Sequence, residues 1–196
     1  MTTNAKPLPK EDLAHALEFA QQDLEQLRGA RLFVTGGTGF FGKWLLATFQ
    51  HANRELRLGA AMTILTRDPT RFRSESPHLA DDSAFTFHSG DVRTFDFPAG
   101  KFTHIIHGAS GPGSGPLEIF ATIVDGTRRT LEFAAQSGVK RLLFLSSGAV
   151  YGPQPSVLTH IPESYLGGPD PLQTASAYGE SKRAAECGLE GIFRSH

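Results

Sequence analysis

The segment Thr35–Gly42, which reads TGGTGFFG, constrains the fold more strongly than any other part of this 196-residue chain. A short apolar run that is typical of a buried strand precedes it, and a helical pattern over Lys43–Gln50 follows it. The glycines are therefore expected on a strand-to-helix turn, where Gly36 permits the tight turn and Gly39 lets the backbone approach a pyrophosphate. Gly42 then lets the helix pack closely on the strand, and the helix N-terminus offers free N–H groups to the phosphates.

A second group of residues lies far downstream. The segment Ser146–Gly152 reads SSGAVYG, and Tyr178 and Lys182 begin and end a YxxxK sequence. Because the tyrosine and the lysine are four residues apart, a helix would project both side chains from one face. A neighbouring ammonium stabilises a phenolate, so such a pair can exchange a proton at neutral pH.

In this order and spacing, the three motifs resemble those of the extended short-chain dehydrogenases/reductases, and within them the NAD-dependent epimerase/dehydratase group that acts on nucleotide sugars. The resemblance covers roughly residues 30–187. It implies an α/β fold, a doubly wound Rossmann-type parallel sheet with helices on both faces. It also implies hydride transfer, in which Tyr178 takes the alcohol proton, Lys182 also holds the nicotinamide ribose, and Ser147 steadies the reacting oxygen.

The predicted cofactor contacts follow from the glycine turn and from the resemblance. Thr66 stands where the family usually has an acid that binds the adenine ribose, and Arg67 follows with a guanidinium suited to a 2′-phosphate. We therefore expect NAD(P), with a preference for NADP. Asp68 precedes Pro69 and is interpreted as the N-cap of a short helix, whereas the resemblance implies that Asp91 faces the adenine amino group. The predicted contacts are Gly36, Thr38, Gly39, Phe40, Phe41, Gly42, Arg67, Asp91, Val92, Gly108, Ala109, Ser110, Tyr178 and Lys182.

Apolar runs and helical patterns alternate along the chain, which is typical of a parallel sheet covered on both faces. Strands are expected at residues 31–35, 61–66, 85–88, 104–109 and 141–146. Helices are expected at residues 11–27 and 117–137, and loops at the polar segments 67–84 and 152–172 and, beside the substrate, at 111–116. We divide the chain into an N-terminal amphipathic helix, residues 1–29, and a dinucleotide-binding domain, residues 30–196.

The sequence leaves the reaction type open between several alternatives. Gly148 and Ala149 follow the serine where a 4,6-dehydratase of this family would carry an acidic pair, so a redox step by an epimerase or a ketoreductase is favoured. Ile123 replaces the asparagine that commonly supports the active-site strand in this family. Acyl-thioester or ketone reductases of the same superfamily share the Gly37–Lys43 start, and a non-catalytic dinucleotide-binding sensor is a further alternative.

Composition argues against several classes of protein. A formal net charge of −1 gives no basis for binding nucleic acid or an anionic membrane, and no apolar run approaches the ~20 residues of a membrane helix. The N-terminus lacks the apolar core of a signal peptide. Cys187 is the single cysteine, and no His or Cys pair has the spacing of a metal site, so we expect a cytoplasmic protein without a metal. We also expect a nucleotide-sugar substrate and a homo-oligomer.

The end of the chain departs from the resemblance. Gly188 and Gly191 are expected to interrupt the helix that carries the YxxxK motif, because each glycine costs ~1 kcal/mol inside a helix relative to alanine. The substrate lobe that follows this motif in the family has no counterpart in the sequence. We therefore expect a protein that is incomplete at the C-terminus and that self-associates through the exposed apolar strand at residues 141–146. Without the lobe that positions the sugar, we expect weak cofactor binding and negligible sugar-dependent redox activity.

Overall fold

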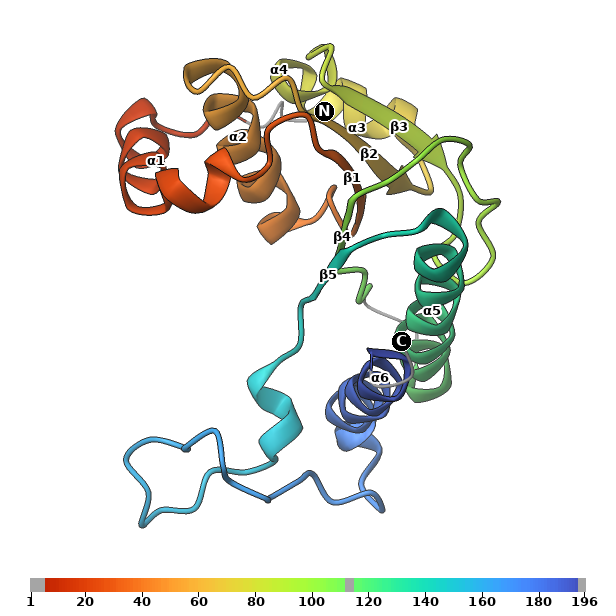
Figure 1. Ribbon diagram of the computed structural model, residues 1–196. Helices are drawn as coiled ribbons and strands as arrows, with labels where there is room; N and C mark the ends of the chain where they lie inside the picture. Colours follow the sequence, from red (N-terminus) through yellow and green to blue (C-terminus); the bar gives the residue numbers. More distant parts are fainter. Residues whose placement is uncertain (1–5, 112–114, 194–196) are drawn as a thin grey trace.

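The computed structural model describes residues 6–111 and 115–193 of the chain and contains a five-stranded parallel sheet (Figure 1). The strands are β1 (Arg31–Thr35), β2 (Ala61–Thr66), β3 (Phe85–Ser89), β4 (His104–His107) and β5 (Arg141–Phe144). Their order across the sheet is β3-β2-β1-β4-β5, so the order reverses between β1 and β4. In open sheets of this kind, ligands bind beyond the carboxyl ends of the strands at that reversal. The predicted doubly wound α/β fold is confirmed.

Helices cover both faces of the sheet (Figure 1). They are α1 (Lys10–Glu25), α2 (Phe40–Glu55), α3 (Pro69–Glu75), α4 (Pro77–Ala80), α5 (Pro116–Ser137) and α6 (Ala177–Phe193), with 3₁₀ turns η1 (Gly148–Tyr151) and η2 (Thr174–Ser176). Helix α1 packs on α2, and α6 packs on α5. No helix of the described residues is long and apolar enough to cross a membrane.

Strand β1 supplies both hydrophobic cores because it is buried on its two faces. Leu32 and Val34 pack with Phe49 of α2 and with the apolar residues of β2. Phe33 points to the opposite face, where its ring lies 4.8 Å from that of Phe133 on α5. Side chains alternate across a strand, so consecutive apolar residues fill both layers at once. This packing fixes the end of β1, and with it the position of the glycine turn.

Two strands end before the sequence predicts. Strand β4 stops at His107. The next N–H, that of Gly108, is shared between the Thr35 carbonyl and the Thr35 hydroxyl, and the Ala109 N–H turns to the hydroxyl. Strand β5 stops at Phe144, and the carbonyl of Leu145 accepts a hydrogen bond from Lys182 instead of continuing the ladder. Side chains of the candidate site thus terminate both strands, which apolar patterning alone does not reveal.

The prediction of a loop over residues 67–84 is wrong, because this segment forms α3 and α4. The Asp68 carboxylate accepts the N–H of Arg71 at 2.9 Å, which confirms the predicted N-cap, and Pro69 occupies the first helical turn. Phe72 and Leu79 anchor the two helices in the core. The loop predicted over residues 152–172 is confirmed, and it stands away from the sheet (Figure 1).

Two helices depart from their predicted limits. Helix α2 begins at Phe40 rather than Lys43, and α6 continues through Gly188 and Gly191, so the predicted interruption is wrong. Packing of α6 along α5 offsets the cost of the glycines. Within the predicted loop at 111–116, residues 112–114 lie outside the described residues, and α5 begins at Pro116.

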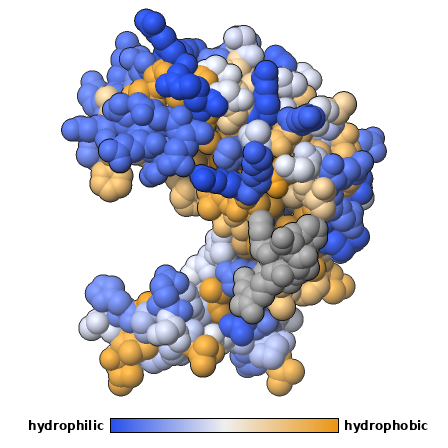
Figure 2. Space-filling view, in the orientation of Figure 1, coloured by the Kyte–Doolittle hydropathy of each residue, from blue (hydrophilic) through white to orange (hydrophobic). Residues whose placement is uncertain are grey.

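The surface of the molecule is hollowed on one side. The space-filling view shows a deep recess between the side formed by α1 and α2 and the lower part of the view, with apolar residues exposed inside it (Figure 2).

Candidate active site

The glycine turn has the close backbone contacts that the sequence predicts. Gly36 adopts φ +76°, and a Cβ atom there would lie 2.5 Å from the carbonyl of Gly108. A Cβ on Gly42 would lie 2.3 Å from the Gly36 oxygen, so Gly42 packs against the turn itself rather than against the strand. Gly39 has an extended backbone, and a Cβ there would meet only the Gly36 oxygen, at 3.4 Å. The space above Gly39 is therefore open to a ligand.

Helix α2 starts at this opening without a side-chain cap. The first N–H groups of a helix have no partner within it and carry a partial positive charge. Phe40 and Phe41 contribute these groups through their backbone, while their side chains are 74% and 72% exposed. A pyrophosphate fits this arrangement, because an open approach over Gly39 leads directly to uncapped helix N–H groups.

A buried hydrogen-bond relay holds the turn in place. The Thr35 hydroxyl accepts the N–H groups of Gly108 at 3.2 Å and Ala109 at 3.1 Å, and it lies 2.6 Å from Nδ1 of His107. Because both N–H groups are donated to Thr35, its own hydrogen goes to Nδ1, and Nε2 of the neutral ring donates to the Thr127 hydroxyl at 3.0 Å. Burial lowers the pKa of His107 to about 3, so the ring stays neutral.

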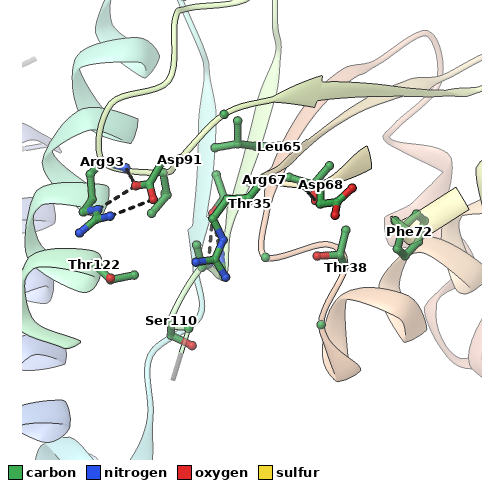
Figure 3. A pocket seen from close by; sticks show the side chains of 18 of the residues that line it. Thr35, Thr38, Leu65, Arg67, Asp68, Phe72, Asp91, Arg93, Ser110 and Thr122 are labelled. Atoms are coloured by element: carbon green, nitrogen blue, oxygen red, sulfur yellow. Dashed lines mark hydrogen bonds and ion pairs between the residues drawn. The ribbon is translucent and has the colours of Figure 1, made fainter. Parts of the chain in front are cut away.

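The cleft beyond the strand ends has a volume of about 480 Å³ (Figure 3). Among its lining residues are nine of the predicted cofactor contacts, namely Gly36, Thr38, Gly39, Arg67, Asp91, Val92, Gly108, Ala109 and Ser110. The other predicted contacts, Phe40, Phe41, Gly42, Tyr178 and Lys182, do not line it. The structure thus brings together segments from β1 to β4 that the sequence separates by over seventy residues.

The charged side chains that line the cleft differ in the partners that hold them. The Asp91 carboxylate is held by Arg93, with Nε at 2.8 Å from Oδ1 and Nη2 at 3.0 Å from Oδ2, and this hydrogen bonding lowers the pKa of Asp91. Asp68 is turned toward the N-terminus of α3. Arg67 extends into the cleft (Figure 3) and, among the described residues, makes no hydrogen bond or ion pair. An anionic ligand group would complement it.

The YxxxK residues lie on the first turns of α6. Lys182 is buried, donates from Nζ to the Leu145 carbonyl at 2.6 Å, and sits 4.5 Å from the centre of the Phe144 ring. Its Nζ lies 5.9 Å from the centre of the Tyr178 ring, so the two side chains lie near each other on α6. Burial lowers the pKa of Lys182 to about 8, and the nearby Glu186 opposes this shift.

Ser147 lies at the start of η1, between β5 and the long loop. Its hydroxyl oxygen accepts the N–H of Ala149 at 3.2 Å, which leaves the hydroxyl hydrogen available to a ligand. No hydrogen bond joins Ser147 to Tyr178 within the described part of the chain. The structure therefore brings Tyr178 and Lys182 together and places Ser147 two residues beyond the carbonyl that Lys182 holds.

Sequence reasoning missed three residues that shape this region. Arg93 holds Asp91, His107 holds the glycine turn through Thr35, and Arg183 binds two carbonyls of other segments. Arg93 could have been found, since an arginine two residues after an acid at a strand end is a candidate partner. His107 and Arg183 carry no such local signal, because their partners are distant in sequence.

Residues 32–196 match the family described as the NAD dependent epimerase/dehydratase family. The chain belongs to this family. UDP-glucose 4-epimerase of Neisseria meningitidis serogroup C is 27% identical to it over 180 residues, which cover 84% of this chain and 49% of the relative. A crystal structure of a UDP-galactose 4-epimerase is 27% identical, with a TM-score of 0.63, over 84% of this chain and 52% of that one.

A second solved structure, the Bordetella bronchiseptica enzyme WbmG in complex with NAD, is 25% identical. Its TM-score is 0.61, and the match covers 82% of this chain and 49% of that one. The chain therefore spans about half the length of the relatives and solved structures that it matches.

Proposed function

We propose that this chain carries the dinucleotide-binding and proton-transfer residues of an NAD(P)-dependent enzyme that oxidises and reduces a hydroxyl group of a nucleotide sugar. The observation that carries the proposal is that Lys182 is buried beside Tyr178 and bonded to the Leu145 carbonyl, which follows β5. This carbonyl and the glycine turn both lie beyond the carboxyl ends of the parallel strands. Nucleotide-sugar enzymes among the relatives support the substrate class.

Each residue has a role that its surroundings allow. When bound, the nicotinamide accepts or returns a hydride. Tyr178 takes the proton of the reacting hydroxyl, and the Lys182 ammonium stabilises the resulting phenolate. Lys182 uses one hydrogen on Leu145, which leaves two for a ribose hydroxyl or for Tyr178. Ser147 donates its free hydroxyl hydrogen to the reacting oxygen.

An epimerase or ketoreductase step is favoured over dehydration. Gly148 and Ala149 are both exposed directly after Ser147, so neither position supplies the acid and base that water elimination requires. The retained Tyr178–Lys182 pair argues against a sensor without catalysis, because a sensor needs only the cleft. Reduction of an acyl thioester is the remaining alternative.

NADP is the preferred cofactor in this proposal. Thr66 is nearly buried, and its hydroxyl accepts the N–H of Asp68 at 3.3 Å, so no carboxylate stands at the usual ribose position. Asp68 caps α3 and Asp91 is bound to Arg93. Arg67 then offers the cleft a guanidinium that no described residue binds, which matches a 2′-phosphate better than a 2′-hydroxyl.

Dinucleotide binding is tested with a valine placed over the open turn. Gly39→Val has no close internal neighbour, so the protein should fold while the side chain blocks the approach to α2. Calorimetry should show NADP binding to the parent and none to this variant. Gly188→Val is the control, because a Cβ on Gly188 likewise has no neighbour within 4 Å among the described residues, and Gly188 lies on α6 and does not line the cleft. Equal affinity of the folded Gly39→Val protein would refute the proposed site.

Cofactor preference is tested with adenosine 2′,5′-bisphosphate and adenosine 5′-monophosphate. Arg67→Ala should weaken binding of the bisphosphate at least tenfold, since a charge-assisted contact contributes about 1.5–3 kcal/mol, and should leave the monophosphate within twofold. Arg71→Ala is the control, because Arg71 also lines the cleft but is paired with Glu75 at 2.7 Å. Equal loss for both probes, or a parent that prefers the monophosphate, would refute the NADP assignment.

The proton-transfer role is tested by following nicotinamide absorbance with UDP-glucose. Any sugar-dependent change in this absorbance should be abolished in Tyr178→Phe. A change that persists in Tyr178→Phe would exclude Tyr178 as the base.

A further inference from the structure

Arg183 joins three segments that are distant in sequence. It lies on α6 directly after Lys182, and its Nη1 donates to the carbonyls of Val150 at 3.0 Å and Gly167 at 2.9 Å. Since this nitrogen carries two hydrogens, each carbonyl receives one. The first carbonyl belongs to η1, which Ser147 caps, and the second lies where the long loop returns. One guanidinium thus ties both ends of residues 151–166 to α6.

The backbone of the two loop ends is in direct contact at the same place. Gly152 adopts φ +70°, and a Cβ atom there would lie 2.3 Å from the oxygen of Gly168. A Cβ on Gly168 would lie 2.9 Å from Nη1 of Arg183. A surface loop whose ends meet in this way is an Ω-loop, and the ribbon shows it projecting from the body of the protein (Figure 1). Arg183 therefore closes the base of the loop.

The base of this loop forms the surroundings of Tyr178. Tyr178 lines a hollow together with Ala149, Gly152, Pro169, Ala175, Ser176 and Gly179. Ala149 comes from η1, Gly152 and Pro169 from the two ends of the loop, Ala175 and Ser176 from η2, and Gly179 from α6. Arg183, itself on α6, bonds to η1 and to the loop return, so it joins three of these parts. The position of the hollow's walls relative to Tyr178 thus depends on the bonds that Arg183 makes.

We propose that Arg183 is a positioning residue for Tyr178 in the reaction proposed above: it holds η1 and the loop return against α6 and so fixes the hollow that Tyr178 faces. The inference rests on the proposed function for its catalytic meaning. A guanidinium suits the role because its planar fork sets the direction of its hydrogen bonds, whereas a lysine ammonium is a rotating point charge. Glu180, one turn earlier, forms an ion pair with the guanidinium, at 4.0 Å from Nε.

The experiment compares Arg183→Met with Arg128→Met in the full chain. Arg128 is also an exposed helical arginine, paired with Glu132 at 2.7 Å, but it lies on α5. The chain has three tyrosines, so ring-labelled tyrosine gives three NMR signals, and Tyr178→Phe assigns one. Chymotrypsin reports on the loop, where Leu166 is 96% exposed and no lysine or arginine occurs.

In Arg183→Met, the Tyr178 signal should shift or broaden, and cleavage after Leu166 should be at least tenfold faster. Binding of adenosine 2′,5′-bisphosphate should stay within twofold, because the dinucleotide cleft does not include this region. Arg128→Met should change none of the three. Faster cleavage with an unmoved Tyr178 signal would mean that Arg183 only stabilises the loop. Unchanged cleavage would mean that Arg183 does not close the base of the loop. Either result overturns the proposal.

Gly168→Ala provides a second test that keeps Arg183, and it decides the matter where Arg183→Met does not fold. Its added methyl group would displace Nη1, so the Tyr178 signal should move as in Arg183→Met. A Tyr178 signal at its parental position in folded Gly168→Ala would overturn the proposal. Failure of the parent to bind any adenine nucleotide would instead refute the proposed function, and the Tyr178 measurement would be unaffected by it.

Discussion

Acid should destabilise this protein through one buried histidine. His107 is fully buried and neutral, and both ring nitrogens are used, since Nδ1 accepts from Thr35 and Nε2 donates to Thr127. A proton on Nδ1 would remove the acceptor that the Thr35 hydroxyl needs, and it would place in the buried site a positive charge that the Lys182 ammonium repels. The folded state therefore resists protonation, while the unfolded chain does not.

The magnitude follows from the two pKa values. Burial lowers the pKa of His107 from 6.5, its ordinary value, to about 3. Between these values the unfolded state binds one proton more than the folded state, so the free energy of unfolding falls by about 1.4 kcal/mol for each pH unit below 6.5. The contribution of the neutral His107 ring to the free energy of unfolding is complete above pH 6.5, and about 2 kcal/mol of this contribution is lost by pH 5.

The assay is urea unfolding at pH 7.5 and at pH 5 for the parent and for His107→Gln. Glutamine has an acceptor and a donor but does not titrate in this range, so the variant should lose about 2 kcal/mol less stability than the parent between the two pH values. Burial also lowers the pKa values of His78 and His104, but both residues are present in the two proteins and cancel in the comparison. An identical pH dependence in parent and variant would refute the reasoning.

Three further predictions concern the fold and its association. Gly36→Ala should lower the free energy of unfolding by about 1–3 kcal/mol in urea titrations, because Gly36 has a positive φ and its Cβ would meet Gly108. A loss of stability no larger than that caused by Gly115→Ala would contradict this prediction. Asp68→Ala should cost about 1 kcal/mol by losing the cap of α3, and unchanged stability would show that the cap is dispensable. Strand β5 is an edge strand within the described residues, and its Leu143 is 56% exposed. Light scattering should therefore show concentration-dependent association that Leu143→Lys reduces, and a monodisperse parent would refute this prediction.

The features that sequence reasoning predicted correctly are those that neighbouring residues in the sequence specify. The glycine turn is specified by backbone conformation, because Gly36 has a positive φ that other residues rarely adopt. The strands were found because parallel strands buried on both faces are continuous apolar runs. The cap at Asp68 was found because an aspartate followed by proline is a local start signal for a helix.

The features that sequence reasoning missed depend on long-range contacts. Helices α3 and α4 were predicted to be loops because their composition is polar, and the decisive contribution is the burial of Phe72 and Leu79 against other elements. The end of β5 depends on Lys182, which is 37 residues away from Leu145. The relay at His107 likewise needs Thr35, at a separation of 72 residues, so neither partner predicts the other by spacing.

The two parts of the candidate site are built from different stretches of chain. The dinucleotide cleft is lined by residues between Thr35 and Thr122, and its geometry is fixed by β1, the glycine turn and the Thr35–His107 relay. The surroundings of Tyr178 come from the stretch after β5, joined by Lys182 and Arg183 through backbone carbonyls. Substitutions in the cleft should therefore change nucleotide affinity without moving Tyr178, and substitutions at the loop base should do the reverse. The hydride transfer proposed above needs both parts to be aligned at the carboxyl ends of the strands. The end of β5 connects them, because the carbonyl that Lys182 holds immediately follows the strand that pairs with β4.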